Sequence, residues 1–79
     1  MRVFYTDVVA IFDEGVGNST LSLALYEIIS KGTVKVQKTG EPRSVVFYDG
    51  EDGKQHAYIS NLSGRALFSR FEKHGFIFI

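Results

Sequence analysis

The sequence has no cysteine, a single proline and no excess of charge of either sign. The absence of cysteine excludes disulfide bonds and thiolate metal sites, so the fold must be held together by packing. Nine basic and nine acidic side chains cancel. This balance argues against general polyanion binding, because non-specific nucleic-acid affinity requires clustered positive charge. We see no signal peptide and no apolar run near the roughly 18 residues of a membrane span, so we expect a cytoplasmic protein.

What the sequence does contain is a large apolar and aromatic share for its length. Hydrophobic residues make up 44% of the 79 positions, and aromatic residues make up 14%. This share is enough for a globular core and argues against disorder. The core of so short a chain is thin. We therefore expect residues 1–79 to form one domain in which Phe and Tyr side chains supply much of the buried area.

Apolar periodicity predicts two helices, over 19–31 and 64–74, and a set of strands. The strands are expected over 2–12 (one long strand, or two pieces broken near Thr6 and Asp7), 33–38, 44–48, 55–60 and 76–79. The resulting order is β-α-β-β-β-α-β, which predicts an α+β fold with a mainly antiparallel sheet and two helices packed on one face. The last strand has no polar residue, so we expect it in the middle of the sheet, beside the first strand.

The glycine-rich stretch before the first predicted helix differs by one residue from the G-x-G-K-[ST] ending of a phosphate-binding loop. Asn18 stands where that loop has lysine, the side chain that reaches the terminal phosphates. We therefore predict a turn that starts a helix, with an anion or nucleotide site as an alternative. The residues that would form that site are Gly15, Gly17, Asn18 and Ser19.

The second predicted helix has a basic face opposite its apolar residues Leu67, Phe68 and Phe71. Its exposed cations are Arg65, Arg70 and Lys73. Such a face is usually only solvated, but together with tyrosines on the strands it gives an alternative function as a nucleic-acid-binding module.

Several apolar residues exceed what two helices on one sheet face can cover. Leu23 and Tyr26 fall off the apolar stripe of the first helix, and the first strand is apolar on both faces. Exposed apolar groups that gather together often mark a partner surface. We expect a protein-binding surface, or a homodimer contact, formed by Leu23, Tyr26, Val3, Tyr5, Val9 and Ile11.

No set of residues specifies a reaction, a cofactor or a metal site. His56 and His74 lack a spacing typical of a triad or zinc site, and both are expected at the surface. Asp49, Glu51 and Asp52 are expected at a solvated hairpin tip. We therefore predict a non-catalytic inhibitor or adaptor that binds another protein. The small size and the absence of motifs are typical of viral (phage) or mobile-element accessory proteins.

Overall fold

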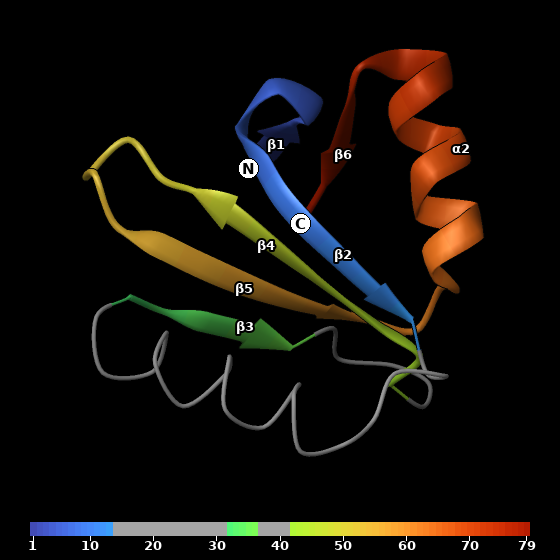
Figure 1. Ribbon diagram of the computed structural model, residues 1–79, viewed down its shortest axis with the longest axis horizontal. Helices are drawn as coiled ribbons and strands as arrows, with labels where there is room; N and C mark the ends of the chain where they lie inside the picture. The colour runs from blue at the N-terminus through green and yellow to red at the C-terminus, as the bar shows by residue number, and fades with distance from the viewer. Residues whose placement is uncertain (14–31, 37–41) are drawn as a thin grey trace.

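The computed structural model describes residues 1–13, 32–36 and 42–79. Within these residues the elements follow the chain as shown in Figure 1: β1 (Arg2–Phe4), the 3-10 turn η1 (Tyr5–Asp7), β2 (Val8–Asp13), β3 (Val34–Val36), β4 (Ser44–Asp49), β5 (Gln55–Ser60), α2 (Gly64–His74) and β6 (Phe76–Phe78). Helix and strands together support the α+β class. The helix predicted over 19–31 lies outside the described residues, so a second helix and its place on a sheet face remain predictions.

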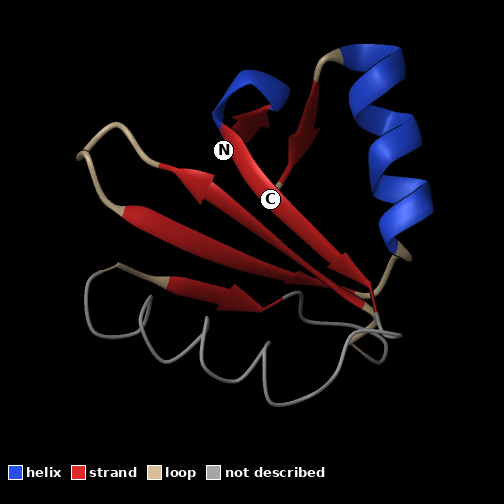
Figure 2. Ribbon diagram, viewed as in Figure 1, coloured by secondary structure: helices blue, strands red, loops and turns tan. Residues whose placement is uncertain are grey.

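The strands form two sheets instead of the expected single sheet (Figure 2). One has four strands in the order β2-β4-β5-β3, with β3 parallel to β5 and the other pairs antiparallel. The other is an antiparallel ribbon of β1 and β6. The pairing of the last strand with the first is confirmed, but its position in the middle of a sheet is wrong. The break is at η1, which separates β1 from β2 so that β1 joins the ribbon.

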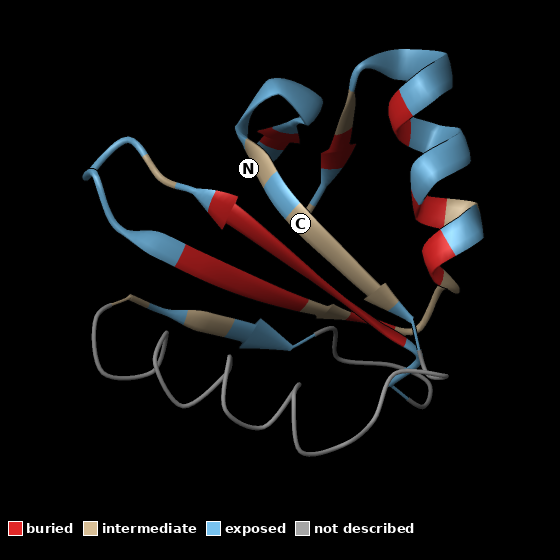
Figure 3. Ribbon diagram, in the orientation of Figure 1, coloured by how far each residue is buried: buried red, intermediate tan, exposed pale blue. Residues whose placement is uncertain are grey.

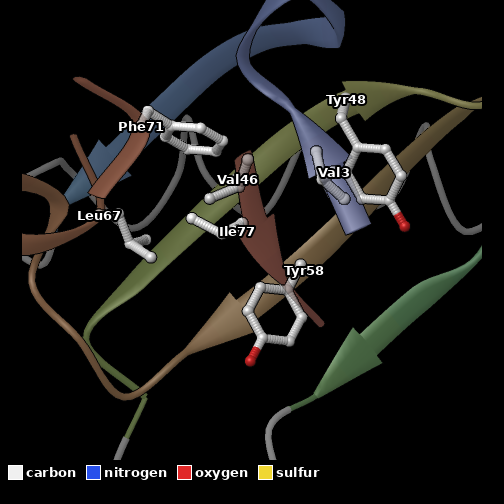
Figure 4. Packing of buried hydrophobic residues seen from close by; sticks show 7 residues of the cluster. All are labelled: Val3, Val46, Tyr48, Tyr58, Leu67, Phe71 and Ile77. Atoms are coloured by element: carbon white, nitrogen blue, oxygen red, sulfur yellow. The ribbon is translucent and has the colours of Figure 1, made fainter. Parts of the chain in front are cut away.

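Both faces of the central strands β4 and β5 are packed, because side chains alternate between faces with a period of two. β4 is buried from Ser44 to Tyr48 (Figure 3). One face forms the main core with α2 and the inner face of the ribbon (Figure 4), and its buried members are Val3, Val46, Tyr48, Tyr58, Leu67, Phe71 and Ile77. The opposite face has a second cluster of Val45, Phe47 and Ala57.

The predicted helix α2 is confirmed together with its capping residues. The Ser63 hydroxyl accepts a hydrogen bond from the Ala66 N–H at 3.2 Å, and Gly75 ends the helix in the left-handed conformation with φ 77°. Leu67 and Phe71 are buried as expected, but Phe68 is 44% exposed, so its predicted burial is wrong. Within the described residues, no helix has the length and apolar character to cross a bilayer.

Candidate functional site

The outer face of the β1–β6 ribbon exposes aromatic rings. Alternation along the two strands sends Val3 and Ile77 into the core, where they are 2% and 5% exposed. The remaining side chains therefore point outward: Arg2, Phe4, Phe76 and Phe78, which together we call the ribbon face. Phe4 is 44% and Phe78 is 73% exposed. The inner face of the ribbon is already filled, so these rings have no place in the core.

The side chains of the ribbon face hold one another in place. The ring of Phe76 lies 5.9 Å from that of Phe4 and 5.2 Å from that of Phe78, the latter in an edge-to-face arrangement. The Arg2 guanidinium lies 5.6 Å from the centroid of Phe4 and 5.4 Å from that of Phe76. Such cation–π contacts are favourable even at exposed sites. The ribbon face is thus an ordered platform and not a set of separate rings.

A shallow groove of about 280 Å³ borders this platform beside α2. Arg70 and His74 line it together with Phe76, Ile77 and Phe78, and the His74 ring is 6.4 Å from the Phe76 ring. Among the described residues, no carboxylate side chain lines this groove. The aromatic surface is therefore edged by positive charge, which favours a ligand that combines apolar area with negative groups.

The structure distributes the expected protein-binding residues among different environments. Val3 is buried and Ile11 packs against the main core, so neither belongs to an open surface. Val9 is 52% exposed at an irregularity in the pairing of β2, and Tyr5 is 44% exposed. The ring of Tyr5 packs against those of Phe68 and Phe71. The face of the first strand was therefore wrongly assigned, because η1 interrupts the alternation on which that assignment depends.

The other expected site residues lie either on α2 or outside the described ranges. Arg65, Arg70 and Lys73 are exposed on α2, as the basic-face hypothesis requires. The remaining candidates are outside the described part of the chain, and their roles remain predictions: Gly15, Gly17, Asn18, Ser19, Leu23 and Tyr26.

His56 is buried, contrary to its expected surface position. It is 9% exposed, and its ring lies 5.5 Å from that of Tyr48. Its Nδ1 accepts the Thr33 N–H at 3.0 Å and lies 2.8 Å from the Thr33 hydroxyl. Its Nε2 lies 3.0 Å from a carboxylate oxygen of Asp52. Because Nδ1 accepts a backbone N–H, the proton of the neutral ring is on Nε2, which donates to Asp52.

Asp52, His56 and Thr33 are connected in the order of a nucleophilic triad, but their hydrogen bonds serve to join two parts of the fold. We call this group of three residues the His56 clamp. A base must accept the proton of the nucleophile, and the Nδ1 lone pair is shared with the Thr33 backbone N–H. The ring thereby joins the start of β3 to the tip of the β4–β5 hairpin. The hydrogen bond from His56, and then the one from the Lys54 N–H, lower the pKa of Asp52 below its ordinary value of 3.8.

Two glycines make room for the His56 ring. A Cβ on Gly50 would lie 2.5 Å from His56 Nε2 and 2.8 Å from Asp52 Oδ1. A Cβ on Gly32 would overlap the carbonyl of Gln55. A side chain at position 32 would therefore require the backbone to move, and one at position 50 would displace the His56 ring and the Asp52 carboxylate. The spacing of these glycines from His56 in sequence could have suggested such a close approach only if the pairing of β3 with β5 were known.

Comparison with protein-family models, with curated proteins and with solved structures finds no significant match to this chain. Function must therefore be argued from the geometry of the ribbon face and of the His56 region.

Proposed function

We propose that this protein is a non-catalytic domain that binds another protein through the ribbon face. The observation that supports this is the group of three neighbouring phenylalanines on an outward strand face, one of them 73% exposed. Each aromatic side chain can bury about 150–250 Å². Phenylalanine and arginine are both enriched at protein–protein interfaces relative to the rest of the surface. The domain would act as an inhibitor or adaptor by covering the surface of its partner.

The charged side chains around the ribbon face indicate which charge the surface of the partner should carry. Arg2 lies over the rings, and Arg70 and His74 line the neighbouring groove. A partner surface that is apolar and bordered by carboxylates would be complementary. Self-association through the centre of this face would place two Arg2 guanidinium groups together, which is unfavourable. A homodimer, if one forms, is therefore expected to use another surface; its existence, a viral origin and a cytoplasmic location remain predictions from the sequence.

The test is a comparison of two surface variants in binding to partners captured from the native cell and identified by mass spectrometry. Phe4→Ser with Phe78→Ser removes the apolar part of the ribbon face, and Val36→Ser removes an apolar side chain of similar exposure, 57%, from β3. We expect the double variant to weaken binding at least about 100-fold, since hot-spot truncations cost about 2 kcal/mol or more each. Val36→Ser should bind normally, and both should melt near the wild-type temperature. A double variant that still binds at full strength contradicts the proposal.

Single-stranded nucleic acid is a second candidate ligand, favoured by one specific observation. Arg70 of the basic helix face lines the same groove as Phe76 and Phe78, and stacking rings next to cations are typical of single-strand binders. A gel-shift assay at two salt concentrations separates the candidates. A shift that disappears steeply with salt favours nucleic acid, whereas no shift at low salt excludes it.

A further inference from the structure

A cavity of about 370 Å³ lies between β1, the start of β3 and the β4–β5 hairpin, away from the groove beside α2. Val3 and Phe4 of β1 supply apolar wall, and the ring of Tyr48 and the His56 clamp supply polar wall. The volume falls within the range of small-ligand sites, which begins at roughly 300 Å³. The cavity is therefore large enough for a small organic molecule or for one long side chain.

Carboxylates outnumber cations around this cavity by four to three. The carboxylates are those of Asp7, Asp49, Glu51 and Asp52, and the cations are Arg2, Lys35 and the N-terminal ammonium of Met1. Arg2 is engaged with the rings of the ribbon face, and the His56 ring is neutral because its Nδ1 accepts an N–H. In the described part of the chain, Asp52 bonds to His56, whereas the carboxylates of Asp7, Asp49 and Glu51 take part in no ion pair or hydrogen bond.

The hydroxyl of a buried tyrosine that opens into the cavity gives a second and independent indication of a ligand. Tyr48 is only 2% exposed, yet it lines the cavity. Within the described residues its hydroxyl makes no hydrogen bond. Figure 4 shows this hydroxyl directed away from Val46, Leu67 and Ile77 of the core. Burial, and then the negative charge of Asp52, raise the pKa of Tyr48 above 10.0, so the phenol stays protonated at neutral pH. The hydroxyl is thus the free polar end of a side chain that is otherwise buried, and a ligand in the cavity would supply it with a partner.

We propose that this cavity binds an alkylammonium group, supplied either by a small aliphatic amine or by a lysine side chain of a polypeptide. The ammonium would donate to the Tyr48 hydroxyl oxygen, and the surrounding carboxylates would balance its charge. Val3 and Phe4 would pack against the alkyl chain. In the described residues no three His, Asp or Glu side chains are grouped closely enough to hold a metal ion. Because the carboxylates around the cavity are spread apart, they are better placed to contact an extended organic cation than a metal ion. This site shares Arg2 and Phe4 with the ribbon face, but its hydroxyl and carboxylates lie outside that face, so it does not depend on the function proposed for it.

The experiment is an NMR titration of the full chain at low salt with three probes. The probes are 1,4-diaminobutane, Nα-acetyl-lysine methylamide and, as a control of opposite charge, glutarate. We expect the two ammonium compounds to shift the amide signals of 48–56 in a saturable way, with dissociation constants that rise with salt, and glutarate to leave them unchanged. Binding of both ammonium compounds supports a general alkylammonium site, and binding of only one identifies the source of the ammonium.

Three variants connect the binding to the named groups. Tyr48→Phe should weaken binding of the bound probe about tenfold, because hydrogen bonds to charged groups are among the stronger ones. Glu51→Gln with Asp49→Asn should weaken it about threefold to tenfold. Glu72→Gln on α2 removes a carboxylate elsewhere and should have no effect. Since Glu51 and Asp49 are exposed, that pair tests the site even if Tyr48→Phe disturbs the core. Absence of saturable shifts at 48–56, equal binding of glutarate, or unchanged affinity in both pocket variants overturns the proposal.

Discussion

The ribbon face and the cavity proposed to bind an alkylammonium group both adjoin the same short strand, β1, and have opposite chemistry. The ribbon face is aromatic and edged by cations, whereas the cavity has four carboxylates near the phenol of Tyr48. Phe4 contributes to both. The ribbon face results from simple alternation along two paired strands. The cavity instead brings together residues that are distant in sequence, such as Lys35 and Asp52, and it depends on the fold of the whole sheet.

The largest expected effect tests whether the two regions belong to one cooperative unit. Phe71 is 2% exposed and shares a core with Val3 and Tyr48, one from the ribbon and one from the cavity. Phe71→Ala should lower the free energy of unfolding by about 3–5 kcal/mol, from a total of about 5–10 kcal/mol. Urea denaturation measures the loss. Phe68→Ala, at a 44% exposed position of the same helix, should cost about 1 kcal/mol or less.

Hydrogen exchange on Phe71→Ala then shows how the regions are connected. We expect the amides of β6 and of 48–56 to lose protection together, because both regions pack on the same cluster. If the amides around the cavity keep their protection while those of the ribbon lose it, the two regions fold independently and the common core is not what couples them.

A substitution of intermediate expected effect should disturb only the region around the cavity. Gly50→Ala places a Cβ against the His56 ring and Asp52, and we expect a loss of about 1–3 kcal/mol in the free energy of unfolding, as for overpacking. Gly53→Asn is the matched control on the same turn. It has φ 77° with nothing within 4 Å of its Cβ position, and asparagine tolerates that conformation. Its loss should be about 1 kcal/mol or less by thermal melting. Equal losses in the two variants would mean that the hairpin tip, and not the His56 clamp, limits stability.

The smallest expected effect is a dependence of the free energy of unfolding on pH, which arises from Asp52 at the edge of the cavity. The pKa of Asp52 in the folded protein is below its ordinary value of 3.8 because His56 and the Lys54 N–H donate hydrogen bonds to its carboxylate. Its ionised form therefore stabilises the fold above that value, and the contribution disappears as the pH falls through the folded pKa. The stability difference between wild type and Asp52→Asn should be present at pH 7 and should shrink as the pH falls below 3.8 in urea denaturation. A difference that does not change with pH would assign the effect of Asn to packing instead of charge.

The sequence was sufficient for elements whose signals are local. The limits of α2 follow from Ser63, the stripe containing Leu67 and Phe71, and Gly75, and the β4–β5 hairpin follows from alternation around a glycine-rich turn. The position of β6 was not predictable in this way. A fully apolar strand usually lies in the middle of a sheet, where both of its faces are covered. In β6, however, only the inner face is covered, by α2 and the four-stranded sheet.

The candidate sites were predictable only in part for the same reason. The cations of α2 were identified, since their exposure follows from helical periodicity. The ribbon face was missed, because the three-residue turn at Tyr5–Asp7 changes which side chains of the first segment face outward. His56 was missed because its partners, Thr33 and Asp52, come from another strand and from a turn. Such convergence depends on tertiary pairing, for which a single sequence carries no direct signal.

Gly75 connects three parts of the molecule through one residue. Its N–H bonds to the carbonyl of Phe71 at the end of α2, and its carbonyl accepts the N–H of Tyr5 at the end of β1. Because strand β6 starts at the next residue, inserting even one amino acid there would move the hydrophobic pattern by one step. Phe76 and Phe78 would then turn inward and Ile77 outward. Length variation should therefore be tolerated at the hairpin tip far better than at this junction, where one extra residue would replace the aromatic surface with an aliphatic one.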